Sequence, residues 1–166
     1  MKRNLLICTT LFLTILLLPA RGDSRSGFGV GVMLGEPTGL SLKQWRDQNR
    51  AWAAGLAWSF ADNPSLHFHL DTLSHTGTPF QTRRRTAIQE NPVFYYGIGS
   101  RIKLESGSDN RRNANDSLLG IRVPLGLSYD LRDLPVDLFV EIVPILDVVP
   151  RTDLSLNAAV GIRYFF

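Results

Sequence analysis

Three potential metal ligands alternate along one short apolar segment, where His67, His69 and Asp71 occupy every second position. Imidazole and carboxylate groups are common metal ligands. However, alternate residues on one strand cannot close a site without further ligands from elsewhere. The same spacing suits polar groups that fill one face of a sheet. We therefore expect no metal and no cofactor here, and interpret these side chains as interior groups able to pair with Arg101 or Lys103.

Serine and histidine also occur together in arrangements that could support acyl transfer. Ser74 and His75 are adjacent, with Glu90 downstream, and Ser65 lies two residues before His67. Such chemistry needs a nucleophile, a base and an orienting group in contact, and no motif in this sequence sets that arrangement. We expect no catalytic residues, while lipid modification stays open as an alternative function.

Single charges stand among Gly, Ala and Ser on the polar face of several alternating segments. Asp137, Glu141 and Asp147 share one segment, whose expected neighbours carry Arg122 and Arg163. Because a buried charge needs a partner, we predict an interior ion network with Glu141 between Arg122 and Arg163. Its predicted members are Arg101, Lys103, Arg122, Asp137, Glu141, Arg163, His67, His69 and Asp71.

The elements that would position these charges are strands. After Gly22 the chain has no long apolar run and no sustained 3.6-residue period, but apolar residues recur at every second position between Gly, Pro, Asn and Asp clusters. In the second segment the alternation slips near Trp45. A polar, basic stretch runs from Ser74 to Asn91. The eight predicted strands are residues 27–35, 40–45, 50–60, 65–73, 93–105, 119–130, 137–147 and 154–166.

The composition of the two faces decides between a soluble sheet and a membrane barrel. Small and singly charged residues suit the narrow interior of an eight-stranded barrel, and apolar residues suit lipid. Aromatic residues lie near strand ends on the apolar face, where membrane barrels carry aromatic girdles: Trp58, Phe60, Phe94, Tyr96, Tyr129, Tyr164 and Phe166. We predict an all-β, antiparallel, up-and-down transmembrane β-barrel of about eight strands. A soluble lipocalin-like barrel would instead place Arg122, Glu141 and Arg163 in water.

Two features depart from the simplest barrel. Pro124 and Pro144 fall inside predicted strands, and a closed barrel has no free edge for a residue without an N–H. We expect a bulge or a strand end at each proline. In addition, the long polar stretch at residues 74–91 would lie at the same end as both termini, where turns are usually short.

The N-terminus predicts export. Lys2 and Arg3 precede a short apolar run, and a small-x-small pattern ends at Gly22, as in a cleaved secretory signal peptide. Residues 1–22 would be the signal peptide and residues 23–166 the barrel domain. Three basic residues leave with the signal peptide, so the formal charge falls from +3 to zero, with 15 Lys and Arg against 15 Asp and Glu. Nothing then favours nucleic acid as a partner. Cys8, the only cysteine, also leaves.

The C-terminal strand resembles a known signal. Phe166, with Tyr164 and Ile162 upstream, is similar to the C-terminal strand of bacterial outer-membrane barrels, and this resemblance implies that the barrel-assembly machinery reads it. The whole mature chain resembles small barrels of the OmpA/OmpX type in layout. More narrowly, "GVMLGEPTGLSLKQW", "FYYGIGSRIKL", "VPLGLSYDL" and "VDLFVEIVPILD" resemble a family of small bacterial outer-membrane β-barrels without established catalytic residues. The resemblance covers nearly all of residues 27–166.

Together these observations predict a monomeric integral protein of a Gram-negative-type outer membrane, in contact with its lipid and lipopolysaccharide. We expect a structural or surface-interaction role, with a lumen plugged by ion pairs. Two alternatives remain: a narrow, porin-like pore, and an enzyme that modifies lipid A, as some small outer-membrane barrels do with Ser, His and a carboxylate at the lipid-facing rim.

Overall fold

The computed structural model describes residues 27–36, 38–59, 65–76, 92–105, 116–131, 134–150 and 152–166. The predicted signal peptide, Phe60 and Glu90 lie outside these residues, as does most of the polar stretch. No helix in the described ranges is long and apolar enough to cross a membrane. The strands are β1 (Phe28–Glu36), β2 (Thr38–Trp45), β3 (Arg50–Ser59), β4 (Ser65–Thr76), β5 (Val93–Glu105), β6 (Asp116–Arg122), β7 (Leu125–Asp130), β8 (Val136–Val149) and β9 (Asp153–Phe165).

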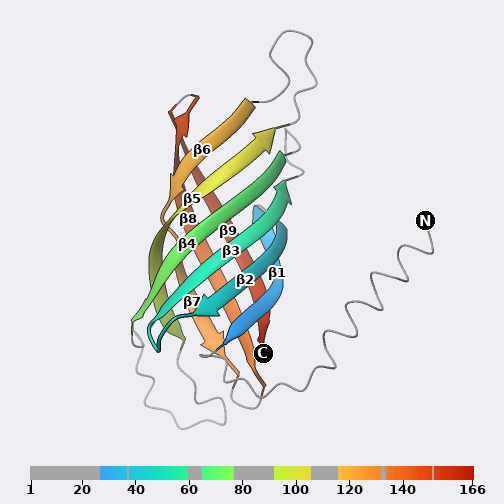
Figure 1. Cartoon of the computed structure of the whole chain (residues 1–166), viewed down its shortest axis with the longest axis vertical. Coiled ribbons are helices and arrows are strands. Elements are labelled where there is room, and N and C mark those ends of the chain that lie inside the picture. Colours follow the sequence, from blue (N-terminus) through green and yellow to red (C-terminus); the bar gives the residue numbers. More distant parts are fainter. Residues whose placement is uncertain are drawn as a thin grey trace, which may run out of the picture.

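The strands close into a ring (Figure 1). Consecutive strands pair antiparallel, except β6 and β7, and β1 pairs with β9 to complete the circle. Both β6 and β7 lie between β5 and β8, so they occupy a single place in the ring. The predicted antiparallel barrel of about eight strands is confirmed. We call the end that holds Gly27 and Phe166 the terminus end, and the other, which holds the β1–β2 and β8–β9 connections, the opposite end.

The strand registers show how strongly the strands are staggered. A path that steps from each residue to its partner on the next strand goes once around the ring. It starts at Leu154 of β9 and returns to β9 at Tyr164. This shift of ten residues means that the strands tilt against the barrel axis, as closed barrels require. The path is Leu154, Leu146, Ile121, Ser100, Leu70, Ala54, Leu42, Val30 and Tyr164.

β6 and β7 are two parts of one strand. Opposite β8, Arg122 pairs with Ile145 and Leu125 pairs with Ile142, which is the same register on both sides of the gap at residues 123–124. The ladder with β5 also keeps its register across the gap. The interruption therefore removes hydrogen bonds without shifting the wall.

Two prolines account for this interruption. The Val123 N–H donates to the Pro144 carbonyl over 3.0 Å, and the Gly97 N–H donates to the Pro124 carbonyl over 2.9 Å. Neither proline has an N–H to return the bond. The strand end expected at Pro124 is confirmed. The expectation at Pro144 is wrong, because β8 runs through it without a bulge against β9, and its missing donor faces the gap between β6 and β7.

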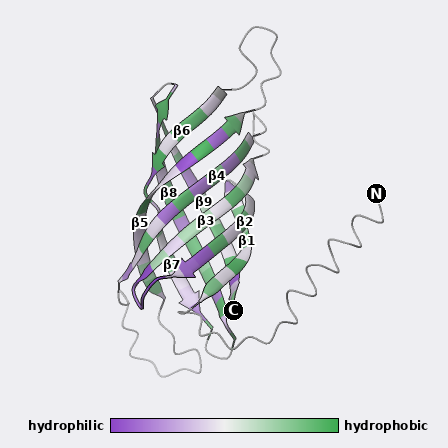
Figure 2. Ribbon diagram, in the orientation of Figure 1, coloured by the Kyte–Doolittle hydropathy of each residue, from purple (hydrophilic) through white to green (hydrophobic). Residues whose placement is uncertain are grey.

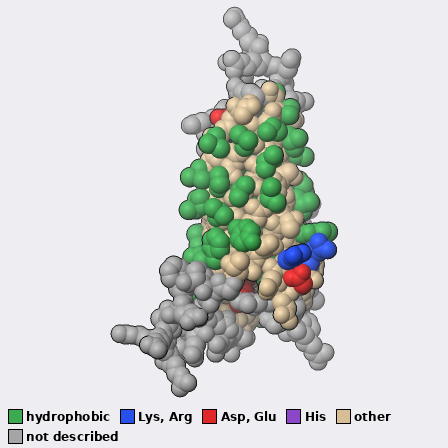
Figure 3. Space-filling model, turned by 90° about the vertical axis from the view of Figure 1, so that its left-hand side faces the viewer, with side chains coloured by type: hydrophobic (Ala, Val, Ile, Leu, Met, Phe, Trp, Pro, Cys, Tyr) green, Lys and Arg blue, Asp and Glu red, His purple; other side chains and the backbone are tan. Residues whose placement is uncertain are grey.

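Side chains alternate between the inside and the outside of the ring, so hydrophilic and hydrophobic residues alternate along the ribbons (Figure 2). On β2 the alternation holds to the end: Trp45 is buried inside, so the predicted slip near this residue is wrong. β4 runs on to Thr76, which places Ser74 and His75 in the strand rather than in the polar stretch. Apolar side chains cover the wall between the two ends in the face shown by Figure 3, while the acidic and basic side chains visible there lie near the ends.

A short hairpin turn at the terminus end connects β2 to β3. The Asp47 carboxylate accepts hydrogen bonds from the N–H groups of Asn49 (2.9 Å) and Arg50 (2.8 Å). These bonds favour the charged carboxylate and hold the pKa of Asp47 below its usual range. The turn thus satisfies two backbone donors that the ladder leaves free.

Glycines make room for the largest interior side chains. A Cβ at Gly126 would lie 2.3 Å from the Tyr95 ring, and a Cβ at Gly161 would lie 2.3 Å from the Phe139 ring. Tyr95 and Phe139 are both buried. A narrow barrel can hold such rings only where the facing strand carries no side chain.

We expect Gly126→Ala to lower the free energy of unfolding by about 1–3 kcal/mol, because the new methyl group overlaps Tyr95 in a filled interior. Urea unfolding of the detergent-solubilised protein measures the change. Ser100→Ala, at an exposed outward position, is the matched control and should leave stability within about 0.5 kcal/mol of the native value. Equal stabilities of the two variants would contradict this account of the packing.

Candidate functional site

The interior of the barrel concentrates the charges of the strands. Among the residues whose burial the structure describes, five cationic side chains and five carboxylates are buried or half-buried on the inner face, so these ten groups are formally neutral together. They are Lys43, Arg101, Lys103, Arg122, Arg163, Asp71, Asp130, Asp137, Glu141 and Asp147. Along β8, Asp137, Glu141 and Asp147 stand at three successive heights, and each faces cations from other strands.

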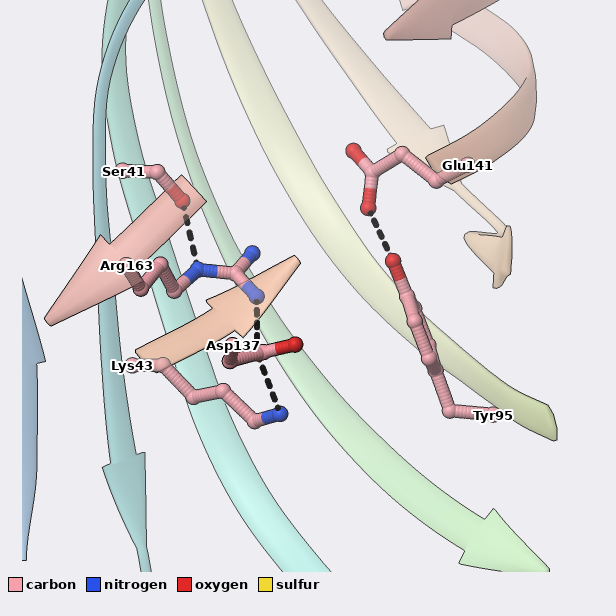
Figure 4. A network of polar contacts seen from close by, with 6 residues as sticks. All are labelled: Ser41, Lys43, Tyr95, Asp137, Glu141 and Arg163. Atoms are coloured by element: carbon pink, nitrogen blue, oxygen red, sulfur yellow. Dashed lines mark hydrogen bonds and ion pairs between the residues drawn. The ribbon is translucent and has the colours of Figure 1, made fainter. Parts of the chain in front are cut away.

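The layer nearest the terminus end is centred on Asp137 (Figure 4). One of its carboxylate oxygens lies 3.2 Å from the Lys43 Nζ and 3.1 Å from an Arg163 Nη. The Arg163 Nε donates to the Ser41 hydroxyl over 2.9 Å, and its guanidinium lies 3.6 Å from the centre of the Phe139 ring. Two cations on one fully buried carboxylate compensate for its loss of water.

The middle layer is centred on Glu141. The Tyr95 hydroxyl donates to one carboxylate oxygen over 3.0 Å, as Figure 4 shows, and Arg122 lies 3.4 Å from the other. Arg122 Nε also lies 3.1 Å from the Asp71 carboxylate, which is 3.9 Å from His69 Nε2. This layer therefore joins β4, β5, β6 and β8 across the interior.

The layer toward the opposite end joins Arg101 and Asp147. The Arg101 guanidinium binds both carboxylate oxygens, with its Nε 3.0 Å from one of them, and Nη2 also donates to Ser155 over 3.2 Å. Two-point guanidinium–carboxylate contacts are among the stronger ion pairs. Lys103 is half-buried and pairs with His67 in the β4–β5 ladder.

Aromatic side chains close the interior at the terminus end. His75 lies between Trp45 and Tyr95, with ring centroids 4.4 and 5.3 Å apart, and the Lys43 ammonium lies 4.3 Å from the centre of the Trp45 ring. Trp45 also packs with the buried Phe165. The sequence predicts small and charged residues inside, and this aromatic layer is not among its predictions.

The structure corrects the predicted pairings within the network. Glu141 contacts Arg122 as expected, but Arg163 lies against Asp137 instead. Arg122 also takes the place of Arg101 or Lys103 as the cation beside Asp71.

Lys43, which was not predicted, is one of the two cations on Asp137. Its alternation with Ser41 and Trp45 on β2 is the signal that could have identified it.

Ser65, His67 and His75, which were considered above for acyl transfer, lie inside the barrel. The Ser65 hydroxyl is 2.9 Å from His67 Nε2, and both residues are buried, as is His75. Lipid-modifying barrels were expected to carry such groups at the lipid-facing rim. Among the described residues, no three His, Cys, Asp or Glu side chains come together as metal ligands would.

The C-terminal residues seal the ring beside β1. The Phe166 N–H donates to the Phe28 carbonyl over 3.0 Å, and Phe165 is fully buried inside. Ile162 and Tyr164 belong to the outward-facing row of β9, and the rings of Tyr164 and Phe166 contact each other edge-on, with centroids 5.1 Å apart. The predicted assembly signal thus lies at the terminus end, with its apolar side chains outside.

This geometry defines the class of protein. It is a closed antiparallel barrel with paired charges inside and apolar side chains outside. Its fold is similar to that of the N-terminal β-barrel domain of OprF from Pseudomonas aeruginosa. The two share 12% sequence identity over 84% of this chain and 95% of that chain, with a TM-score of 0.59. At this identity the likeness concerns the fold alone. No family model matches the chain, and no curated protein matches it.

We expect Asp137→Ala to lower the free energy of unfolding by about 3–5 kcal/mol, because it leaves Lys43 and Arg163 buried without their shared carboxylate. Asp153→Ala removes the same side chain at an exposed position and should change stability by less than about 0.5 kcal/mol. Urea unfolding at neutral pH compares the two. A loss at Asp137 no larger than that at Asp153 would mean that this layer does not stabilise the barrel.

Proposed function

We propose that the chain is an integral outer-membrane β-barrel with a structural or surface-interaction role, whose lumen is plugged by ion pairs and which performs no catalysis. In this proposal residues 1–22 are removed after export and the mature chain is a monomer. Its terminus end faces the periplasm, and the barrel-assembly machinery recognises the strand that ends in Phe166. The partners are membrane lipid and lipopolysaccharide, with no nucleic acid.

The distribution of charge over the two faces supports this proposal most directly. Between the two ends, the described outward positions of the strands carry no Asp, Glu, Lys or Arg, whereas Arg122, Glu141 and Arg163 are 3%, 7% and 3% exposed. A soluble barrel of this size would turn its apolar faces inward. Lipid is the solvent that makes an apolar outside and a charged inside stable together.

Aromatic side chains support a membrane position for the terminus end. Large rings with outward-facing positions gather there, as in the girdles of membrane barrels. They include Phe28, Phe94, Tyr96, Tyr129, Tyr164 and Phe166. Phe94 and Tyr96 also contact each other, with ring centroids 6.3 Å apart.

The plugged interior favours a structural role over a pore. A continuous path would have to pass the aromatic layer at Trp45 and His75, and then three sets of paired charges. A narrow pore is the second candidate, because the Arg122–Glu141 contact at 3.4 Å is the longest of these pairs. The likeness to the OprF barrel domain fits either role. The buried positions of Ser65 and His67 speak against a lipid-modifying site at the rim.

The first test is electrophoresis of membrane-extracted protein in dodecyl sulfate, with and without boiling. A closed barrel whose strands are hydrogen-bonded to both neighbours over most of their length should resist the cold detergent, so the unboiled protein should run at a different position from the boiled protein. Recovery in the soluble fraction without a shift would overturn the proposal.

Conductance separates the two roles. We expect the purified native barrel to give no steady single-channel current in a planar lipid bilayer at neutral pH, because paired side chains fill the lumen. A steady current that rises with salt concentration would favour the narrow pore instead. Empty bilayers exposed to the same detergent serve as the control.

A further inference from the structure

The wall of the barrel is notched beside β1. The ladder between β1 and β9 ends at the pair Glu36–Ala158, whereas the ladder between β8 and β9 continues to the pair Asp147–Asp153. Residues 153–157 of β9 therefore extend past the end of β1. Figure 1 shows the β1–β2 hairpin ending well short of the β8–β9 hairpin.

The exposed edge of β9 is polar along its backbone and apolar on its outer face. In the β1–β9 ladder the even-numbered residues of β9 point their backbone groups toward β1, as the Phe166 N–H does. The backbone groups of Leu154 and Leu156 therefore face the notch, where the described part of the chain places no strand. Their side chains are 74% and 68% exposed. Because unpaired backbone groups are stable only in contact with water, the notch is open to solvent.

A small cavity lies beside the notch. It has a volume of about 10 Å³, enough for one water-sized group. Glu36 and Ala158, the last pair of the β1–β9 ladder, line it, and so do His69, Arg122 and Glu141 of the middle layer. The notch and the middle ion layer are therefore connected through this cavity.

The cavity is rich in hydrogen-bond acceptors. The residues that line it include Glu36, Glu141, Asn157 and His69, all of which carry hydrogen-bond acceptors. His69 is 5% exposed, and its Nδ1 has no hydrogen-bond partner. Glu141 shares its cation, Arg122, with the carboxylate of Asp71. A small cation with N–H donors fits this lining in charge and in hydrogen bonding.

Within the described part of the chain, side chains fill the interior between this cavity and the terminus end. Lys43, Trp45, His75 and Tyr95 fill the interior there, and Lys43 is 1% exposed. A group that enters through the notch would stop at the middle layer.

We propose that the notch leads into a blind vestibule that binds a primary ammonium group at Glu141, His69 and Asn157. The ammonium group would enter from the opposite end, past Glu36, and donate its N–H groups to the carboxylate, the imidazole and the amide. This inference needs the closed barrel but not its location in the outer membrane, so it can be tested in detergent.

Cysteine modification tests both the opening and the preference for cations. Cys8 is the only cysteine of the chain, so with Cys8→Ser each new cysteine is labelled alone. Asn157→Cys reports on the cavity, and Leu156→Cys, exposed on the outer face, is the matched control. Each detergent-solubilised variant is treated with 2-aminoethyl methanethiosulfonate, which carries a primary ammonium group, and with the anionic 2-sulfonatoethyl reagent.

For each variant, the measured quantity is the rate of modification by the ammonium reagent divided by the rate of modification by the sulfonate reagent. We expect this ratio to be roughly tenfold larger for Asn157→Cys than for Leu156→Cys. Adding Glu141→Gln should reduce this preference. Glu36→Gln should reduce it too, and because Glu36 is exposed at the rim, this variant avoids disturbing the middle layer. The mobility shift on cold gels verifies that each variant is folded.

Two results would overturn the inference. If neither reagent modifies Asn157→Cys in a folded barrel, the vestibule is closed. If both reagents react at the same normalised rate, or the sulfonate reagent reacts faster, the vestibule is open but is not a cation site. Neither result bears on whether the barrel spans a membrane, which the boiling test decides separately.

Discussion

Inside the ring, a charged side chain has only other side chains and trapped water to replace bulk solvent, and the pairing of these charges constrains the rest of the barrel. Asp137 shows the constraint most clearly, since it is fully buried and contacts both Lys43 and Arg163. Each partner comes from a different strand, β2, β8 and β9, so the contacts form only when the registers are correct. A shift of one residue in any of these strands would turn its own charged side chain outward and break the cluster. The ion layers therefore select one register for the whole wall.

The volume of the interior imposes the second constraint. Tyr95 and Phe139 each occupy space that a residue other than glycine would take on the facing strand, at Gly126 and Gly161. Large and small residues thus complement each other across strands, in the same way that cations and carboxylates do. Together they leave a crowded interior, and the cavity beside the middle layer has a volume of only about 10 Å³.

The sequence predicted the elements of this fold better than their contacts. Alternation with a period of two is local, so it identified the strands and showed that Arg122, Glu141 and Arg163 lie inside. Which charges meet depends on the stagger of ten residues around the ring, which no local pattern contains. Arg163 was therefore assigned to Glu141 although it meets Asp137, four residues away on β8. The predicted ion network omits Lys43 because the sequence pattern suggests a break in the alternation near Trp45. In the structure Trp45 is an interior residue, so Lys43, two positions earlier, points inside as well. The pairings in the middle layer and in the layer toward the opposite end depend on the same stagger, so the sequence alone does not predict them.

The equal numbers of interior cations and carboxylates have an electrical consequence. In the described part of the chain, five charges of each sign lie on the inner face, so a uniform field along the barrel axis exerts no net force on them. A change of voltage across a membrane does work on a protein in proportion to the charge it moves. A rigid displacement of this interior moves none. Voltage would therefore act on these ten groups only by pulling one partner of a pair away from the other.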